Sequence, residues 1–248
     1  MWVEGTIQGR RDWTDKLFSL QIKADISPFI AGQFIKLSLQ HEERRVGRAY
    51  SLVNPPGSEY LEVLAVAVED GQLSPKLQDL DVGDTVEVSA TATGFMTLDE
   101  LPRADRTGRQ LWMLATGTAI GPFISMLKTP EPEARFEHLV VVYGVRHAED
   151  LAYLADLQAL ATANPNFHLV LSVTREPFPQ ALQQRIPQAL ASGELEAMTG
   201  LSLSPEYSQV MICGNPGMVA ECQTLLLERG LVKNLRRAPG NITVEKYW

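Results

Sequence analysis

Hydrophobic and polar positions divide the chain into two halves with different patterns. In about the first hundred residues, short apolar runs alternate with polar residues, as in Phe18–Ile22, Phe34–Leu39 and Leu61–Val68. Turn-forming segments such as Asn54–Gly57 separate these runs. Because alternation with period two is typical of half-buried strands, this half predicts an antiparallel β-barrel over residues 1–101.

The second half carries near-continuous apolar runs separated by longer helical patterns. It follows the polar stretch Pro102–Arg109 and covers residues 108–248. Such runs are typical of parallel strands covered on both faces, so we expect a doubly wound α/β domain whose ligands bind outside the carboxyl ends of its strands. The expected strands are Leu111–Ala115, Leu139–Tyr143, His168–Val173 and Val210–Cys213, and the expected helices are Pro122–Lys128, Asp150–Ala163 and Gly217–Arg229.

Composition limits the classes of cofactor and partner. The chain has 248 residues, 45% of them hydrophobic and 21% charged, which is ordinary for a globular protein. It has no apolar run near the roughly 20 residues that cross a bilayer and no signal-peptide pattern, so we expect no membrane association and a cytoplasmic location. Two cysteines and four scattered histidines exclude a four-cysteine iron–sulfur cluster and argue against zinc, so any redox cofactor should be organic. The net charge of −8 argues against nucleic-acid binding.

Two short segments of the first half have side chains that suit a flavin nucleotide. In Arg48-Ala49-Tyr50-Ser51, an arginine can pair with pyrophosphate, a tyrosine can pack on a ring, and a serine can hydrogen-bond a heterocycle. The alternative is a surface arginine beside a half-buried strand tyrosine. In Gly71–Pro75, Ser74 can cap a helix that begins at Pro75, and such a helix start either binds phosphate or binds nothing.

Two segments of the second half follow apolar strands and open helices. Ala115–Pro122 has glycines that let the backbone approach a ligand, but it departs from the GxGxxG fingerprint, which favours a relative of the standard dinucleotide fold. In Cys213–Met218, Cys213 is either a small buried residue or a side chain that lines a reactive ring.

Two arginines and the carboxyl-terminal aromatic residues are further candidates for binding a phosphate and a flavin. Arg175 and Arg185 follow a strand end, and a pair of arginines there favours NADP over NAD because the guanidinium fork suits a 2′-phosphate. The segment Val244–Trp248 ends in two aromatic residues. They either stack on a flavin or plug a hydrophobic seam between domains.

Taken in this order, the segments resemble the bacterial ferredoxin–NADP⁺ reductases, in particular the branch with a carboxyl-terminal Tyr-Trp, over essentially the whole chain. The resemblance implies a ferredoxin reductase-like fold with FAD on the barrel and NADP(H) on the α/β half. The FAD residues that it implies are Arg48, Ala49, Tyr50, Ser51, Ala65, Val66, Gly71, Leu73, Ser74, Thr116, Tyr247 and Trp248. The NADP residues that it implies are Arg146, Arg175, Arg185, Gly214 and Asn215, and the residues beside the reacting rings are Ser51, Cys213 and Glu245.

The resemblance also implies an activity. NADPH gives a hydride to the flavin, and the reduced flavin passes single electrons to a ferredoxin or flavodoxin. Glu245 is a candidate proton relay or flavin-edge contact, and the aromatic terminus is a candidate gate. Gln72 stands where relatives often carry lysine, which leaves a side-chain contact with the pyrophosphate open at this position.

The expected partner surface is a basic rim on an expected monomer. An acidic ferredoxin or flavodoxin would dock there, and the rim would include Arg44, Arg45, Arg236 and Arg237. The rival enzyme class is a reductase of the same fold that uses NADH or NADPH and serves an oxygenase or free flavin. A different class, a regulatory subunit that binds flavin or nucleotide without turnover, would keep the stacking residues too.

Overall fold

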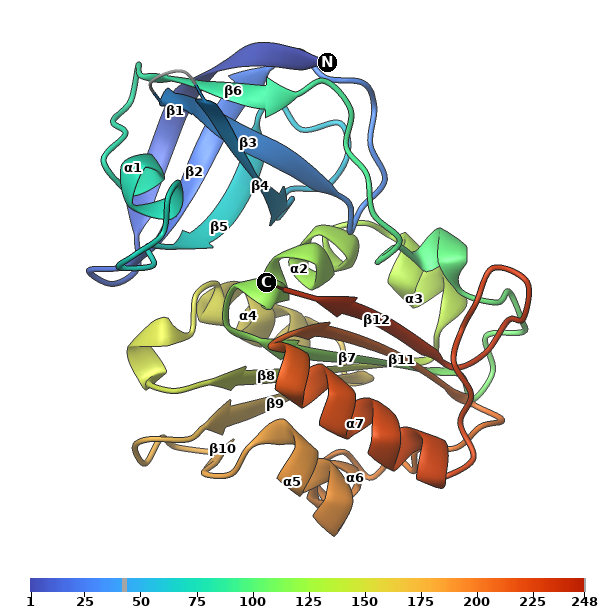
Figure 1. Ribbon diagram of the computed structural model, residues 1–248. Coiled ribbons are helices and arrows are strands. Elements are labelled where there is room, and N and C mark those ends of the chain that lie inside the picture. Colours follow the sequence, from blue (N-terminus) through green and yellow to red (C-terminus); the bar gives the residue numbers. More distant parts are fainter. Residues whose placement is uncertain (42–43, 248) are drawn as a thin grey trace. The chain divides into compact units, whose positions relative to one another are not determined.

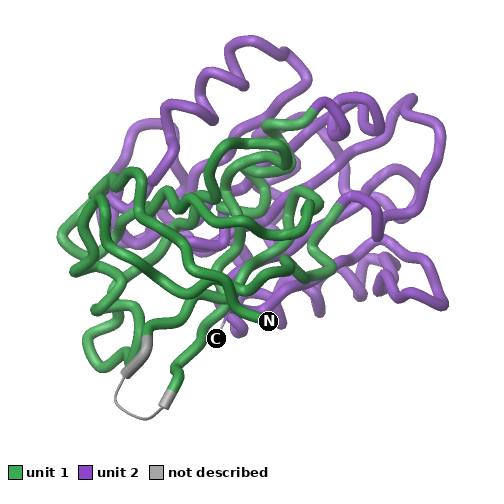
Figure 2. Tube along the Cα trace, turned by 90° about the horizontal axis from the view of Figure 1, so that it is seen from above, with its two compact units in different colours: residues 1–97, 121–129 green, residues 98–120, 130–248 purple. Residues whose placement is uncertain are grey.

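A computed structural model describes residues 1–41 and 44–247, without the side chains of residues 40, 41 and 44 (Figure 1). The chain forms two compact units (Figure 2). Unit 1 comprises Met1–Thr97 and Gly121–Thr129, and unit 2 comprises Leu98–Ile120 and Pro130–Trp248. The chain therefore enters unit 2, returns to unit 1 for one short segment, and then completes unit 2.

Unit 1 is built on an antiparallel sheet with the strand order β4-β3-β6-β1-β2-β5. Beyond the end of β4, Leu52 pairs with Val63 of β5, so the two outer strands meet and the sheet curls into the predicted barrel. Alternate residues of β2, Phe18, Leu20 and Ile22, point into its apolar core. The elements are β1 (Trp2–Asp12), β2 (Leu17–Ala24), β3 (Phe34–His41), β4 (Arg44–Ser51), β5 (Leu61–Val66), α1 (Ser74–Gln78), β6 (Thr85–Ser89) and α2 (Gly121–Leu127).

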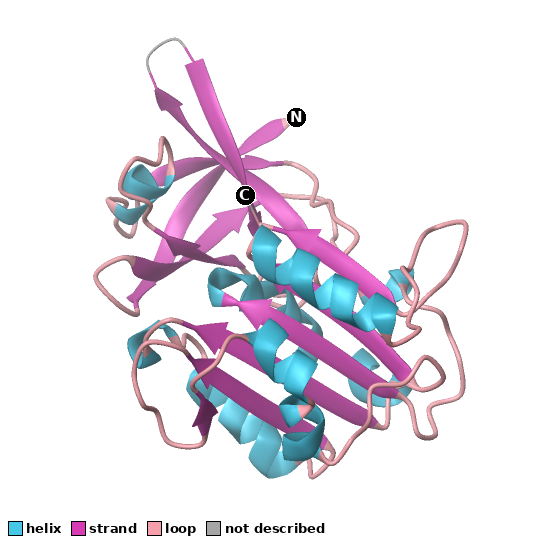
Figure 3. Ribbon diagram, turned by 60° about the horizontal axis from the view of Figure 1, so that its bottom comes forward, coloured by secondary structure: helices cyan, strands magenta, loops and turns pink. Residues whose placement is uncertain are grey.

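Unit 2 is built on a parallel sheet with the strand order β10-β9-β8-β7-β11-β12 (Figure 3). The chain runs outward from β7 to β10 and then returns to place β11 on the other side of β7, so the order reverses between β7 and β11. The strands are β7 (Gln110–Thr116), β8 (His138–Val145), β9 (Phe167–Val173), β10 (Ala181–Leu182), β11 (Ser208–Gly214) and β12 (Ile242–Lys246).

Helices cover both faces of this sheet, as the sequence predicts. Figure 1 shows α3 and α4 on one face and α5, α6 and α7 on the other. The helices are α3 (Glu131–Arg135), α4 (Leu154–Ala163), α5 (Ile186–Ser192), α6 (Glu194–Thr199) and α7 (Pro216–Glu228), and the 3₁₀ turns are η1 (Leu98–Glu100), η2 (Gly117–Ile120) and η3 (Ala148–Asp150). No helix in the described residues is both long and apolar enough to cross a membrane.

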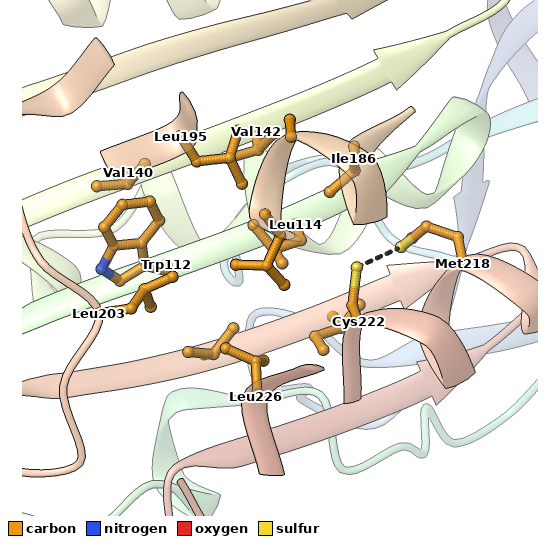
Figure 4. Close-up of a cluster of buried hydrophobic side chains, with 14 of the residues drawn as sticks. Trp112, Leu114, Val140, Val142, Ile186, Leu195, Leu203, Met218, Cys222 and Leu226 are labelled. Carbon is orange, nitrogen blue, oxygen red and sulfur yellow. Dashed lines mark hydrogen bonds between the residues drawn. The ribbon is translucent and has the colours of Figure 1, made fainter. Parts of the chain in front are cut away.

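One hydrophobic core of unit 2 lies between the sheet and α5, α6 and α7 (Figure 4). Met218, Cys222 and Leu226 are four residues apart on α7, so they share the face that packs on the sheet. The Cys222 thiol lies 3.8 Å from the sulfur of Met218, and burial raises its pKa to about 12. Cys222 is therefore a protonated core residue.

Two expected elements end or begin elsewhere. The expected strand Leu61–Val68 stops at Val66, because Val68 enters a turn in which its carbonyl accepts the Gly71 amide at 2.7 Å. The expected helix Asp150–Ala163 begins at Leu154 instead, because Tyr153 has a φ of 57° and breaks the helical path after η3.

Candidate cofactor-binding sites

The last four residues of β4 form the predicted flavin-binding segment in unit 1. Arg48 and Tyr50 lie on one face of the sheet, and Ala49 and Ser51 lie on the other. Arg48 and Ala49 are exposed, Tyr50 is half-buried, and Ser51 is buried. Burial raises the pKa of Tyr50 to about 12, although the charge of Arg48 acts in the opposite direction. At neutral pH the strand thus ends in a cation, a neutral phenol ring and a buried hydroxyl.

Arg48 is joined to the segment between β5 and α1. Its Nη2 donates to the side-chain oxygen of Gln72 at 3.2 Å, and its Nη1 donates to the Gly47 carbonyl at 3.0 Å. From the sequence alone, Gln72 is only a departure from the lysine that relatives often carry. In the structure its neutral amide accepts from the guanidinium, whereas a lysine here would add a second positive charge beside Arg48.

The turn from Val68 to Ser74 corrects the capping prediction. The helix α1 begins at Ser74 rather than Pro75, with Leu73 as its N-cap and without a side-chain cap hydrogen bond. The Ser74 hydroxyl instead accepts the Val68 amide at 3.1 Å. A Cβ on Gly71 would lie 2.8 Å from the Ser74 hydroxyl oxygen and 2.9 Å from the Val68 carbonyl oxygen, so the turn requires glycine there.

Two of the predicted FAD residues in this part of unit 1 belong to the barrel core. Ala65 and Leu73 are 2% exposed and belong to the core cluster, while Val66 is half-buried. The side chains of Ala65 and Leu73 are therefore used in packing. Any contact that these two residues make with a ligand would come from their backbone.

In unit 2, three strand ends meet beside the reversal in strand order. Cys213 of β11 pairs with Ala115 of β7 on one side and with Glu245 of β12 on the other. The Thr116 hydroxyl accepts the Asn215 amide at 3.0 Å. Gly214 has a φ of +136°, and a Cβ there would lie 2.1 Å from the Thr116 hydroxyl oxygen. The approach of β7 to β11 thus depends on glycine.

The buried groups in this row have shifted protonation equilibria. Cys213 is fully buried. Burial and then the charge of Glu245 raise the pKa of its thiol well above the usual value, against the effect of a hydrogen bond with Tyr247. Burial raises the pKa of Glu245 from 4.5 to about 7. The thiol is therefore protonated at neutral pH, whereas Glu245 can either hold or release a proton there.

The predicted NADP arginines converge on the carboxyl ends of β8 and β9. Arg146 follows β8, Arg175 follows β9, and the Arg175 amide donates to the Arg146 carbonyl at 3.0 Å. Arg185 is the N-cap of α5, and the residue before it accepts the Ser172 hydroxyl of β9 at 2.6 Å. All three arginines are exposed, so a ligand can reach each of the three guanidinium groups.

Two carboxylates near these arginines were missed by the sequence analysis. Glu176 accepts the Ala148 amide at 2.5 Å and so ties the loop after β9 to the loop after β8. Glu221 of α7 forms an ion pair with Arg185 at 2.8 Å. The position of Glu176 beside Arg175 was a weak signal for the first contact. The second joins residues 36 positions apart, and no local pattern predicts it.

The predicted helix starts have different uses. Asn215 caps α7, because its side-chain oxygen accepts the amides of Gly217 and Met218 at 2.9 and 3.2 Å, which confirms Asn215-Pro216 as a helix start. Gly121 begins α2, and a Cβ there would lie 3.3 Å from the Val53 side chain. This glycine is therefore explained by packing within unit 1.

The predicted partner-binding arginines also differ in their surroundings. Arg45 forms an ion pair with Glu87 and lies over the Trp2 ring, 5.2 Å from its centre. Arg236 and Arg237 are exposed in the turn between the paired residues Leu235 and Ala238. The side chain of Arg44 lies outside the described residues, and so does the whole of Trp248. The Tyr247 amide, next to it, donates to the Gly214 carbonyl at 2.9 Å.

Comparisons with known proteins agree with the fold and with its two cofactor-binding halves. Residues 11–96 match the oxidoreductase FAD-binding domain, and residues 113–224 match the oxidoreductase NAD-binding domain. The fold and these two matches therefore define a two-part flavin- and nicotinamide-dependent oxidoreductase. The chain belongs to the flavodoxin/ferredoxin–NADP reductase family.

Three relatives support that assignment. The flavodoxin/ferredoxin–NADP reductase of Escherichia coli (strain K12) is 47% identical over 100% of this chain and 99% of its own. The ferredoxin–NADP reductase of Pseudomonas aeruginosa is 34% identical over 94% of this chain and 93% of its own. The structure of a ferredoxin NADP⁺ reductase from Neisseria gonorrhoeae with bound FAD and NADP superposes with a TM-score of 0.92, at 33% identity over 100% of this chain and 99% of that one.

Proposed function

We propose that this protein is an FAD-dependent reductase that moves electrons between NADP(H) and a ferredoxin or flavodoxin. The observation that carries the proposal is the set of three exposed arginines, two after the ends of β8 and β9 and one at the start of α5, in a member of this reductase family. The adenosine ribose of NAD offers only two neutral hydroxyls at this position, which do not require three positive charges. A 2′-phosphate is a dianion that several guanidinium groups can bind. This favours NADP(H) over NAD(H).

The residues of unit 1 fit the flavin nucleotide. Arg48 would hold the pyrophosphate, Tyr50 would pack on the ring system, and Ser51 would hydrogen-bond it. The glycine turn at Gly71 would let the backbone approach the phosphates. We assign FAD to residues 1–101 together with Thr116, Tyr247 and Trp248, and NADP(H) to the rest of residues 108–248.

The residues of unit 2 would bind the nucleotide and control a proton. Arg146, Arg175 and Arg185 would hold the 2′-phosphate, and Gly214 and Asn215 would line the approach to β11. When bound, FAD supplies the conversion between a two-electron hydride donor and one-electron carriers. Cys213 would lie beside the reacting ring with a buried, neutral thiol, and Glu245 would hold or release one proton near pH 7.

The experiment is an anaerobic titration of the purified holoprotein, followed in the visible spectrum. We expect a yellow protein that NADPH bleaches at much lower concentration than NADH. Equal bleaching by both nucleotides would reject the NADP assignment and favour the oxygenase-type or flavin-reductase alternative. A protein that takes up no FAD would reject the proposal as a whole.

The partner follows from charge. An acidic ferredoxin or flavodoxin would dock at the basic rim, for which Arg236 and Arg237 are exposed. Partner-dependent turnover should slow as salt rises, and an unchanged rate would reject electrostatic docking. The monomeric state and the cytoplasmic location remain predictions, and light scattering of the holoprotein tests the first.

A further inference from the structure

Arg185 is the predicted phosphate-binding arginine that already has an anionic partner. Its Nη2 lies 2.8 Å from Oε1 of Glu221, and the two side chains are 49% and 48% exposed. Within the described residues, neither Arg146 nor Arg175 forms such an ion pair. The pair joins the start of α5 to α7.

The backbone of Arg185 is held in place, so only its side chain needs to move when it exchanges one anionic partner for another. The Arg185 amide donates to the Gln188 side chain at 2.9 Å, and the following residue, Ile186, is buried against Gly144 of β8. Water reaches both members of the ion pair, and exposed pairs of this kind are weakly held. A phosphate dianion can therefore replace the carboxylate on the guanidinium without movement of α5.

We propose that Glu221 is a selectivity residue that competes with the 2′-phosphate of NADP(H) for Arg185. The inference rests on the proposed function. In the free protein Glu221 neutralises Arg185, and NADPH must exchange a carboxylate for its phosphate. The carboxylate then stays close to the bound phosphate and repels it. Nucleotides without a 2′-phosphate leave the ion pair intact and are indifferent to Glu221.

The test measures binding of two nucleotide fragments to the FAD-loaded protein by calorimetry at low, fixed salt. Adenosine 2′,5′-bisphosphate carries the 2′-phosphate, and 5′-AMP lacks it. We expect Glu221→Gln to lower the Kd of the bisphosphate by about three- to tenfold and to leave that of 5′-AMP unchanged. Glu228→Gln makes the same charge change on an exposed residue about two turns further along α7, and it should alter both Kd values by less than about twofold.

A double variant separates a local effect from a general one. If Glu221 acts through Arg185, the gain from Glu221→Gln disappears in an Arg185→Gln background. An unchanged or higher Kd in Glu221→Gln would overturn the inference, and so would an equal gain in the Arg185→Gln background or in Glu228→Gln. These outcomes leave the preference for NADPH in the anaerobic titration untouched, so the failure of the inference and that of the proposed function are distinguishable.

Discussion

The two units assemble their candidate sites in opposite ways. In unit 1, four consecutive residues of β4 carry a cation, a ring and a hydroxyl, and one neighbouring turn completes the set. In unit 2 the candidates come from five strand ends between Thr116 and Tyr247 and from the start of α5, and the sheet topology brings the strand ends to one edge. A barrel strand can thus carry a site within its own sequence, whereas a parallel sheet builds one from distant segments.

The arginines of the two units also have different partners. Arg48 contacts the neutral amide of Gln72, which leaves its full charge for a ligand. Arg185 contacts the carboxylate of Glu221, which offsets its charge. In unit 1 a phosphate would therefore bind an arginine that has no carboxylate partner among the described residues. In unit 2 one of the three arginines, Arg185, is already paired with a carboxylate.

The largest expected effect concerns the close approach of β7 to β11 at Gly214, beside the candidate site of unit 2. Gly214→Ala should destabilise the protein by about 3–5 kcal/mol, because Gly214 combines a φ of +136° with a Cβ position 2.1 Å from the Thr116 hydroxyl oxygen. Urea unfolding measures the change. Gly200→Ala is the control: its φ is +70° but its Cβ would meet open space, so it should lose only about 1 kcal/mol. Equal losses would show that the close approach to Thr116 has no energetic weight.

The next prediction separates the two sites by their arginines. Arg48→Ala should weaken FAD binding by about 10- to 100-fold, and Arg175→Ala should weaken binding of adenosine 2′,5′-bisphosphate by a similar factor, since each loses hydrogen bonds between charged groups. Neither substitution should affect the other ligand. Flavin fluorescence and calorimetry measure the two affinities. Loss of both ligands in either variant would contradict the division of labour between the units.

A third prediction concerns pH and the half-buried carboxyl group of Glu245 in unit 2. The pKa of Glu245 is about 7 in the folded protein and 4.5 when unperturbed, so between these values the folded state keeps a proton that the unfolded state has lost. Deprotonation therefore favours the unfolded state in this range, and the free energy of unfolding falls as pH rises from about 4.5 to about 7. Allowing for partial exposure, Glu245→Gln should stabilise the apoprotein at pH 8 by about 1–3 kcal/mol more than at pH 5.

Urea unfolding at the two pH values measures this difference. The exposed Glu228→Gln serves again as the control and should show no pH-dependent gain. Parallel pH profiles for wild type and Glu245→Gln would mean that Glu245 has an ordinary pKa in the folded protein.

The smallest effect concerns the turn of unit 1. Ser74→Ala removes the acceptor of the Val68 amide and should cost about 1 kcal/mol by urea unfolding. Because that amide lies in the turn and not in α1, its hydrogen exchange should accelerate while the amides of α1 keep their protection. Faster exchange throughout α1 would instead restore Ser74 as a helix cap.

Local patterns predicted the features that depend on neighbouring residues. Period-two alternation indicated the barrel strands, apolar runs indicated the parallel sheet, and Asn215-Pro216 marked the start of α7. The match of Arg48–Ser51 with the end of β4 follows for the same reason, because the whole segment lies on one strand.

Features that depend on which of several possible partners a group contacts were not predictable. The Ser74 hydroxyl could have capped the nearby helix α1, but it accepts a hydrogen bond from the Val68 amide instead. The contact of Arg185 with Glu221 depends on how α5 and α7 pack, and the contact of Arg48 with Gln72 depends on how the β5–α1 segment returns to β4. The roles of the site residues toward FAD and NADP(H) stay predictions until ligand binding is measured.

The place of α2 in the chain bears on how such proteins can recombine. This helix follows β7 in sequence but belongs to unit 1, where Ser125 donates to the Asn54 carbonyl at 2.7 Å and six of the seven helical residues are buried. A chimera with one crossover between residues 97 and 121 would therefore give a barrel the α2 of another parent. Exchange of a whole flavin-binding module needs two further crossovers around α2, so we expect the halves of this family to be inherited together.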